Sequence, residues 1–207
     1  MPHHLIEGLQ RFKRETFPRY RDRYRRLVDE GQKPSTLFIG CADSRVVPDM
    51  LLDAGPGELF LVRNVAALVP PFEPDGAYHG TAAGIEYAVQ HLRVTDIVVC
   101  GHSHCGGIRA LYDAPDPETP HISRWLELAR RARVDDDGDG NEPSNAILRR
   151  AEQRSIALQL ERLLTYPMVQ REVDEGTLSL HGWHYIIEEG RVLALDVDRE
   201  EFVPIGE

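Results

Sequence analysis

The segment DIVVCGHSHCGG, residues 96–107, joins a short apolar run to a loop rich in glycine, histidine and cysteine. Its first half, 96–101, has the β-branched composition of a buried strand. Similar runs occur at TLFIG (36–40) and ELFLVRN (58–64), and helical patterns such as 81–94 lie between the runs. Alternation of strands and helices is typical of an α/β fold. We therefore expect a mostly parallel central β-sheet flanked by helices.

The two ends of the chain are expected to add to this sheet. Residues 5–30 show one or two amphipathic helices, with a possible break at Pro18, which predicts an N-terminal helical arm over 1–30. Residues 177–198 contain two runs of β-forming residues around EEG, which predicts a C-terminal β-hairpin. The length of 207 residues fits one domain, 1–207.

The bulk composition excludes several classes of partner. A formal net charge of −10 argues against nucleic acid and against anionic membranes. The sequence has neither an apolar run long enough for a transmembrane helix nor a visible signal peptide, so we expect a cytoplasmic location. The three cysteines do not indicate a disulfide framework. Metal binding and plain burial remain as their roles.

Three side chains are expected to converge where the predicted strands end. Cys41 and His102 lie at the carboxyl ends of strands that would be neighbours, about 4.8 Å apart. Cys105 follows in an H-x-x-C spacing. Two thiolates and one imidazole suit Zn²⁺, and the absence of a fourth such ligand indicates an open site. We expect His104 to face solvent and Cys100 to be a buried thiol.

Asp43 and Arg45 follow the first cysteine closely and are candidates to control the open position. A free Asp43 carboxylate could bind the metal and close the site. Paired with Arg45, it would be held away and could accept a hydrogen bond from the zinc-bound nucleophile. The simpler interpretation is a surface ion pair that caps the next helix.

Two other ligand loops are considered and set aside. The glycines of GHSHCGG resemble a phosphate-binding loop, but Gly107 and Ile108 replace its lysine and hydroxyl residue. The segment 134–144 resembles a calcium loop, but Ala146 stands where the bidentate glutamate is required. A solvated turn is the preferred interpretation there.

The motifs GCADSR (40–45) and GHSHCGG (101–107) resemble the C-x-D-x-R and H-x-x-C motifs of the β-class carbonic anhydrases. The likeness extends over roughly residues 30–187. Within the family, the sequence resembles the plant-type branch, which is found in chloroplasts and many bacteria. It implies a single β-carbonic anhydrase-like domain that hydrates CO₂ reversibly to bicarbonate and a proton by attack of zinc-bound hydroxide. The alternatives are a COS or CS₂ hydrolase on the same scaffold and a non-catalytic zinc-binding or redox module.

The resemblance also implies roles for individual residues. The implied zinc ligands are Cys41, His102 and Cys105, with Asp43 as a conditional fourth ligand in an inactive form and the Asp43–Arg45 dyad as catalytic groups. The implied substrate residues are Gln32, Phe60, Val65, Tyr87 and Gly106. His91 matches a proposed proton shuttle of the family, and the alternative is an ordinary surface histidine.

The resemblance further implies self-association. In that family Gln, Phe and Tyr face the zinc of the partner subunit, so the active unit is expected to be a dimer in which the arm 1–30 takes part, with a tetramer also open. Some bacterial members are inhibited by bicarbonate at a separate pocket. Arg63, Tyr87 and Val46 match that pocket, but Phe38 replaces its tryptophan, and we therefore expect no such regulation.

Overall fold

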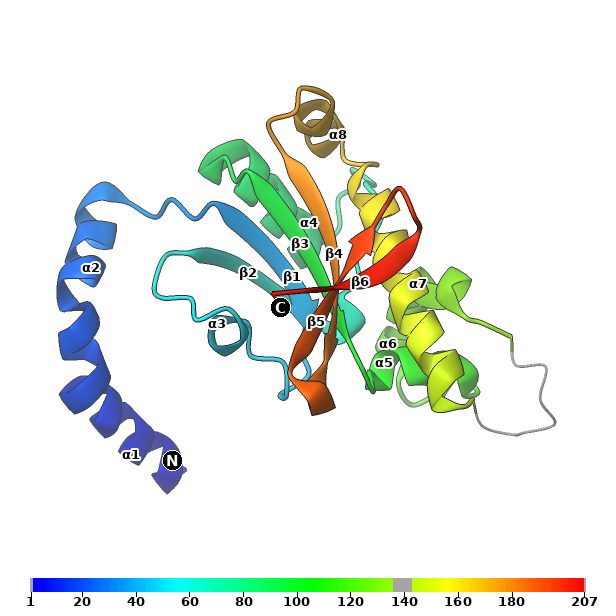
Figure 1. The fold of residues 1–207 in the computed structure, drawn as a ribbon, viewed down its shortest axis with the longest axis horizontal. Coiled ribbons are helices and arrows are strands. Elements are labelled where there is room, and N and C mark those ends of the chain that lie inside the picture. The colour runs from blue at the N-terminus through cyan, green and yellow to red at the C-terminus, as the bar shows by residue number, and fades with distance from the viewer. Residues whose placement is uncertain (1, 136–142, 207) are drawn as a thin grey trace.

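The computed structural model describes residues 2–135 and 143–206, and its centre is one six-stranded sheet (Figure 1). The strands, in chain order, are β1 (Thr36–Cys41), β2 (Leu59–Asn64), β3 (Asp96–His102), β4 (Ser179–Ile186), β5 (Arg191–Asp196) and β6 (Glu201–Ile205). They lie in the order β2-β1-β3-β4-β5-β6. The first four strands are parallel, and β5 and β6 extend the sheet in antiparallel fashion.

The predicted fold class is thereby confirmed. The expected hairpin is formed by β4 and β5, and β4 is also the fourth strand of the parallel part. The sequence pattern gave no sign of the edge strand β6, which pairs with β5.

Helices follow most of the strands, and several are extended by short 3₁₀ or π segments. The α-helices are α1 (His3–Arg11), α2 (Phe17–Glu30), α3 (Pro48–Leu51), α4 (Gly80–Glu86), α5 (Gly106–Arg109), α6 (Pro120–Leu126), α7 (Asn145–Leu163) and α8 (Pro167–Asp174). The longest of these, α7, begins at a regular cap, in which the Ser144 hydroxyl accepts from the Ile147 N–H.

The two faces of the sheet differ in what covers them. On one face, alternate residues of β1 and β3 such as Leu37 and Val99 join a large core with α4, α7 and α8. On the other face, the buried cluster consists of Phe38, Val98 and Cys100. Its partly buried neighbours are Leu52, Trp183 and Tyr185. The second face therefore has much less of its own chain packed on it.

Two glycines let α7 approach the sheet closely. A Cβ added at Gly101 would lie 2.8 Å from the Ile156 side chain, and one added at Gly182 would lie 2.9 Å from it. Gly101 is on β3 and Gly182 on β4, opposite one residue of the helix. Because any larger residue would push α7 outward, these glycines set the depth at which α7 reaches the end of β3.

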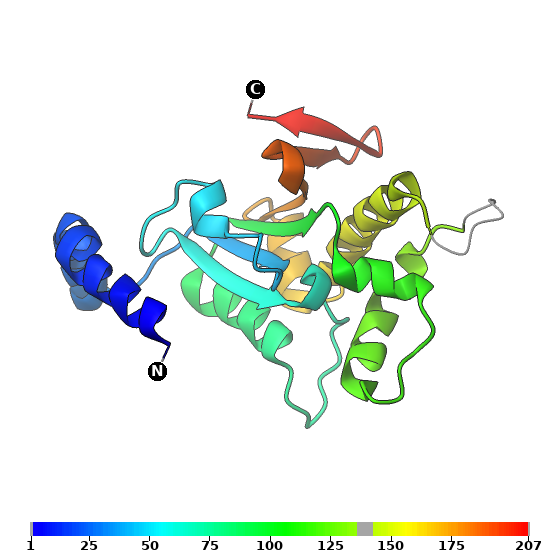
Figure 2. The ribbon, with the colours of Figure 1, turned by 90° about the horizontal axis from the view of Figure 1, so that it is seen from below.

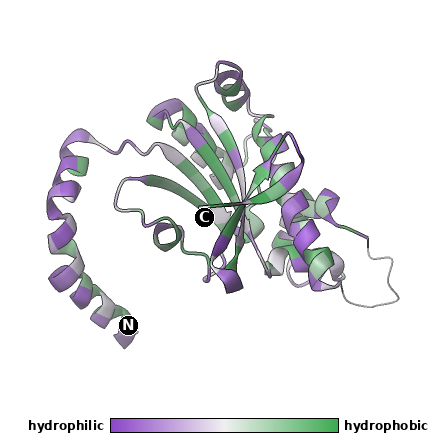
Figure 3. Cartoon of the chain, in the orientation of Figure 1, coloured by the Kyte–Doolittle hydropathy of each residue, from purple (hydrophilic) through white to green (hydrophobic). Residues whose placement is uncertain are grey.

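The N-terminal arm formed by α1, a π segment and α2 stands apart from the sheet (Figures 1 and 2). Pro18 lies in the first turn of α2, where proline is tolerated, so the chain continues as helix through the expected break. No residue of α1 or α2 is buried, and the arm exposes apolar side chains including Leu5, Leu9 and Phe12. In Figure 3 the arm is largely hydrophilic, whereas the central strands are largely hydrophobic. Within one chain, Leu27 and Tyr20 of α2 lie against the turn at Gly55 and Gly57, whereas the apolar side chains near the start of the arm stay exposed.

Across the described residues, every helix is too short or too polar to cross a membrane. The calcium-loop resemblance falls mainly on residues 136–142, which lie outside the described part of the chain, so the preferred turn there stays a prediction.

Candidate metal centre

The predicted convergence of two cysteines and a histidine is present in the structure. Cys41 ends β1 and His102 ends the neighbouring parallel strand β3. Cys105 lies three residues later, immediately before α5. The Sγ atoms of the cysteines and a ring nitrogen of His102 all lie within 4.8 Å of one another, and all three residues are buried. Such a cluster can hold one metal ion.

The imidazole of His102 is arranged as a metal ligand. Its Nδ1 lies 2.9 Å from the Ser103 carbonyl oxygen, which fixes Nδ1 as the donor and leaves Nε2 as an acceptor. Among the described residues, Nε2 of His102 is the one buried side-chain polar atom with no hydrogen-bond partner. Buried polar atoms normally have a partner, so an unpartnered imidazole nitrogen in this position is a ready metal ligand. With two thiols beside it, the donor set fits zinc.

The three cysteines differ in their acid–base behaviour. A hydrogen bond from the Cys105 thiol and the nearby His102 lower the pKa of Cys41, to which the Asp43 N–H also donates at 3.4 Å. The same thiol pairing raises the pKa of Cys105. Burial raises the pKa of Cys100 to about 12, so this residue stays a neutral thiol in the core, as expected. A bound cation would deprotonate both clustered thiols.

Asp43 is held beside the cluster by Arg45. The Arg45 side chain donates from Nε to Oδ1 at 3.0 Å and from a terminal nitrogen to Oδ2 at 2.8 Å. These bonds hold the pKa of Asp43 well below its usual range. Arg45 also donates to the His104 carbonyl at 3.0 Å and so links the two loops, while the His104 side chain is exposed, as expected. The pair therefore does more than cap a helix.

The predicted substrate residues fall into two groups at opposite ends of the strands. Val65 follows β2 directly, and its side chain would lie 3.2 Å from a Cβ added at Gly107, so it is close to the metal loop. Gly106 begins α5 and has open space where a side chain would be. These two residues share the edge that carries the cysteines.

The other group lies at the far edge. Phe60 pairs with Leu37, four residues before Cys41, which places it about 13 Å along the strand from the cluster. Tyr87 packs on Phe60 with ring centroids 5.7 Å apart, and His91 packs on Tyr87 at 5.2 Å. Gln32 is exposed in the connection that precedes β1. The metal cluster of the same chain is out of reach for this group.

The region around Phe38 differs from what the bicarbonate-pocket match suggested. Arg63 donates to the backbone carbonyls of Cys41, Asp43 and Val46, the last two at 2.8 Å. Its guanidinium therefore fixes the backbone of the loop 41–46, which carries Cys41 and Asp43. The tyrosine near Phe38 is Tyr185, next to Trp183, whereas Tyr87 contacts Phe60 and His91.

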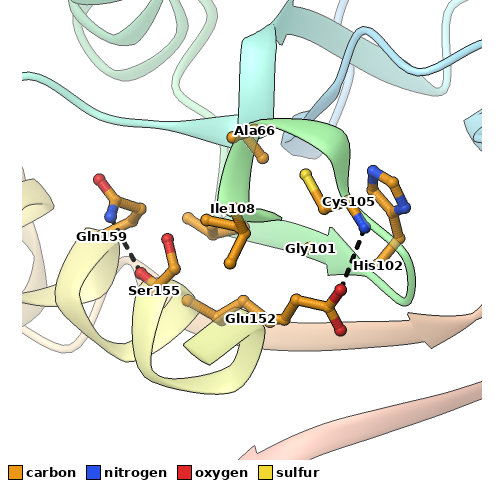
Figure 4. A pocket seen from close by; sticks show the side chains of 11 residues that line it. Ala66, Gly101, His102, Cys105, Ile108, Glu152, Ser155 and Gln159 are labelled. Carbon is orange, nitrogen blue, oxygen red and sulfur yellow. Dashed lines mark hydrogen bonds between the residues drawn. The ribbon is translucent and has the colours of Figure 1, made fainter. Parts of the chain in front are cut away.

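Several polar residues around the centre were missed at the level of sequence. Glu152, on α7, accepts a hydrogen bond from the Cys105 N–H and lines a small cavity next to His102 (Figure 4). Glu188 accepts from the Ser103 hydroxyl at 2.7 Å. The one available signal was a carboxylate on the apolar stripe of α7, four residues from both Leu148 and Ile156.

Comparison with known proteins identifies close relatives. A sequence model described as carbonic anhydrase matches residues 36–192. A carbonic anhydrase of Pseudomonas aeruginosa is 40% identical over 204 residues, which cover 98% of this chain and 91% of the relative. A carbonic anhydrase of Helicobacter pylori is 34% identical over 209 residues, with 97% and 93% covered.

Solved structures agree. The β-carbonic anhydrase CcaA superposes with a TM-score of 0.88 at 38% identity, covering 99% of this chain and 92% of that one. A tetrameric β-carbonic anhydrase of Sordaria macrospora gives a TM-score of 0.80 at 28% identity, covering 94% and 96%.

Proposed function

This chain belongs to the β-carbonic anhydrase family, and from that premise we propose that zinc is its metal, held by Cys41, His102 and Cys105. A carbonic anhydrase interconverts carbon dioxide with bicarbonate and a proton. The observation that carries the metal proposal is the orphaned Nε2 of buried His102 beside two thiols. When bound, zinc supplies a Lewis acid that lowers the pKa of water enough to provide a nucleophile at neutral pH.

Asp43 and Arg45 have distinct roles in this proposal. Asp43 accepts a hydrogen bond from the attacking water and so orients it towards the carbon of CO₂. Arg45 holds the carboxylate by two hydrogen bonds and keeps it out of the cluster. Oδ2 of Asp43 is nevertheless only 3.9 Å from Nε2 of His102, so release from Arg45 would let Asp43 become a fourth ligand in an inactive form.

The substrate pocket is proposed to form between two copies of the chain. Val65 and Gly106 line the centre of their own chain, whereas Gln32, Phe60 and Tyr87 lie at the opposite end of the strands. A two-fold partner could bring this second group to the centre. Its amide and rings would then orient CO₂ and exclude water.

Self-association also fits the exposed apolar surfaces. The first half of the arm exposes Leu5, Leu9 and Phe12, β2 exposes Leu61 on the second face of the sheet, and α3 exposes Met50. We propose that the arm covers part of the partner and that the dimer can pair further into a tetramer. The solved relative from Sordaria macrospora is described as tetrameric, which supports the larger assembly.

Two further assignments belong to the same proposal. His91 packs on Tyr87 and is exposed, which suits a proton shuttle at the edge of the partner's pocket. Regulation by bicarbonate is not expected, because Phe38 is fully buried and Arg63 is engaged by three backbone carbonyls.

Stopped-flow CO₂ hydration on purified protein, combined with a zinc assay, tests the proposal. We expect one zinc per chain and a hydration rate that disappears when a chelator removes it. COS and CS₂ are assayed in parallel. Stoichiometric zinc with turnover of COS or CS₂ but not CO₂ would contradict the substrate, and zinc without any turnover would leave a binding module.

A further inference from the structure

We propose that Glu152 and His184 are positioning residues that fix the metal ligand Cys105 from the α7 side of the sheet. The inference rests on the proposed zinc site and concerns a part of the chain outside both ligand motifs. It is carried by a buried chain of hydrogen bonds that ends at the Cys105 backbone.

The carboxylate of Glu152 uses both oxygens in this chain. Oε1 accepts from the Cys105 N–H at 3.0 Å, and Oε2 lies 3.1 Å from Nε2 of His184 (Figure 4 shows the first contact). Glu152 is 4% exposed and His184 is 0% exposed. Both partners of the carboxylate are therefore fixed within the protein and shielded from water.

His184 is oriented from its other side. Its Nδ1 lies 3.5 Å from Nε2 of Gln153, an amide nitrogen that can only donate. Nδ1 is then the acceptor, which leaves Nε2 to donate to Glu152. The His184 ring also meets Phe202 edge-on at 6.2 Å. The imidazole thus holds the carboxylate in one rotamer.

Core packing alone does not account for this pair. Burying a carboxylate is costly even when it is hydrogen-bonded, and apolar residues of similar volume would fill the same space without that cost. The structure nevertheless brings α7 close enough for Glu152 to reach the metal loop, by means of glycines at 101 and 182. Oε1 of Glu152 then accepts the hydrogen bond from the backbone N–H of Cys105, the metal ligand itself.

The physical effect is on the direction of the Cys105 side chain. Fixing the peptide N–H of Cys105 fixes the orientation of its Cα–Cβ bond and hence where Sγ lies relative to Cys41 and His102. Partners that orient metal ligands typically change metal affinity by about 10- to 100-fold when they are removed. We expect a loss in that range when the bond to Cys105 is removed.

Cobalt(II) titration of the metal-free protein tests this inference, because the visible bands of cobalt report ligand geometry. Four single variants are compared: Glu152→Ala, Glu152→Gln, His184→Phe and, as a matched control on the exposed side of α7, Glu161→Ala. Glu152→Ala should bind cobalt about 10- to 100-fold more weakly and shift the bands. Glu152→Gln keeps an oxygen for the Cys105 N–H but turns an N–H towards His184 Nε2, so it should restore part of the affinity that Glu152→Ala loses. His184→Phe should shift the bands as well, and Glu161→Ala should leave both readouts unchanged.

A purely structural role has a different signature. A Glu152→Ala protein that unfolds more easily but binds cobalt with wild-type affinity and bands would overturn the inference. Should that variant not fold, His184→Phe decides, and unchanged bands there would equally overturn it. Failure of the wild type to bind cobalt or zinc would instead contradict the metal proposal itself.

Discussion

Arg45 donates three hydrogen bonds to the Asp43 carboxylate, two from its side chain and one from its backbone N–H, at 2.8 to 3.0 Å. The carboxylate so held lies 3.9 Å from Nε2 of His102, a buried nitrogen with no hydrogen-bond partner among the described residues. The carboxylate is close enough to take the fourth position on a metal but is directed to the guanidinium instead. In this conformation Asp43 is paired with Arg45, and on the proposed function Arg45 is the residue that keeps the metal position open.

Replacing Arg45 with alanine should release Asp43. Its pKa should rise towards the ordinary value, and the freed carboxylate should occupy the open position. We expect unchanged zinc content and a fall in the CO₂ hydration rate of about 100-fold, the range associated with a misplaced acid–base group. Arg171→Ala, which removes another exposed arginine paired with an acid, is the control. A wild-type rate in Arg45→Ala would show that this pairing is dispensable.

Replacing Cys105 with serine should abolish zinc binding, because a hydroxyl is a poor substitute for one of two thiolates. Elemental analysis of the purified variant should find almost no zinc, and activity should be lost with it. Cys100→Ala is the matched control, since Cys100 is buried on the other face and its thiol stays neutral. Stoichiometric zinc in Cys105→Ser would refute the ligand assignment.

Placing charge on the apolar stripe of the arm should separate the subunits. Leu9→Glu combined with Phe12→Glu alters two exposed side chains, so the fold of one chain should survive. Sedimentation should show monomers that retain zinc but lose most activity, because Gln32, Phe60 and Tyr87 no longer reach a partner's centre. Lys13→Glu on the same arm controls for charge. A fully active monomer would contradict the shared pocket.

Glu188 should make stability depend on pH in the acid range. The hydrogen bond from Ser103 lowers the pKa of Glu188 from 4.5 to about 2. A carboxyl whose pKa is lower in the folded state stabilises that state above the unfolded value and loses the effect as pH falls. Glu188→Gln should therefore be less stable than wild type above pH 4.5, with the difference closing between 4.5 and about 2. Urea unfolding at several pH values measures it, and a pH-independent difference would exclude the carboxylate as its cause.

Substituting Gly101 should disturb the packing of α7 against the sheet. An alanine Cβ there would lie 2.8 Å from Ile156, and overpacking of this kind typically costs about 1–3 kcal/mol in the free energy of unfolding. Chemical denaturation checks the loss. Gly80→Ala is the control, because nothing lies within 4 Å of its added Cβ. Equal stability of the two variants would mean that α7 shifts without cost.

The metal cluster could be predicted from sequence because Cys41 and His102 each follow a recognisable buried strand, and parallel neighbours end at one edge. The bond from Cys105 to Glu152 could not, since it joins residues 47 positions apart through a helix whose depth depends on packing at Gly101 and Gly182. The separation of Phe60 and Tyr87 from the cluster also needed strand register, which composition does not specify. The edge strand β6 is short and contains a proline, so its residue pattern does not predict a strand.

Anomalous diffraction at the zinc edge, on crystals grown at the pH of the activity assay, tests the central claim most directly. The account predicts one zinc per chain bound by Cys41 Sγ, His102 Nε2 and Cys105 Sγ, with solvent in the fourth position and Asp43 still paired with Arg45. Zinc elsewhere in the chain, or zinc in a crystal of active enzyme with all four positions filled by protein atoms, would contradict it.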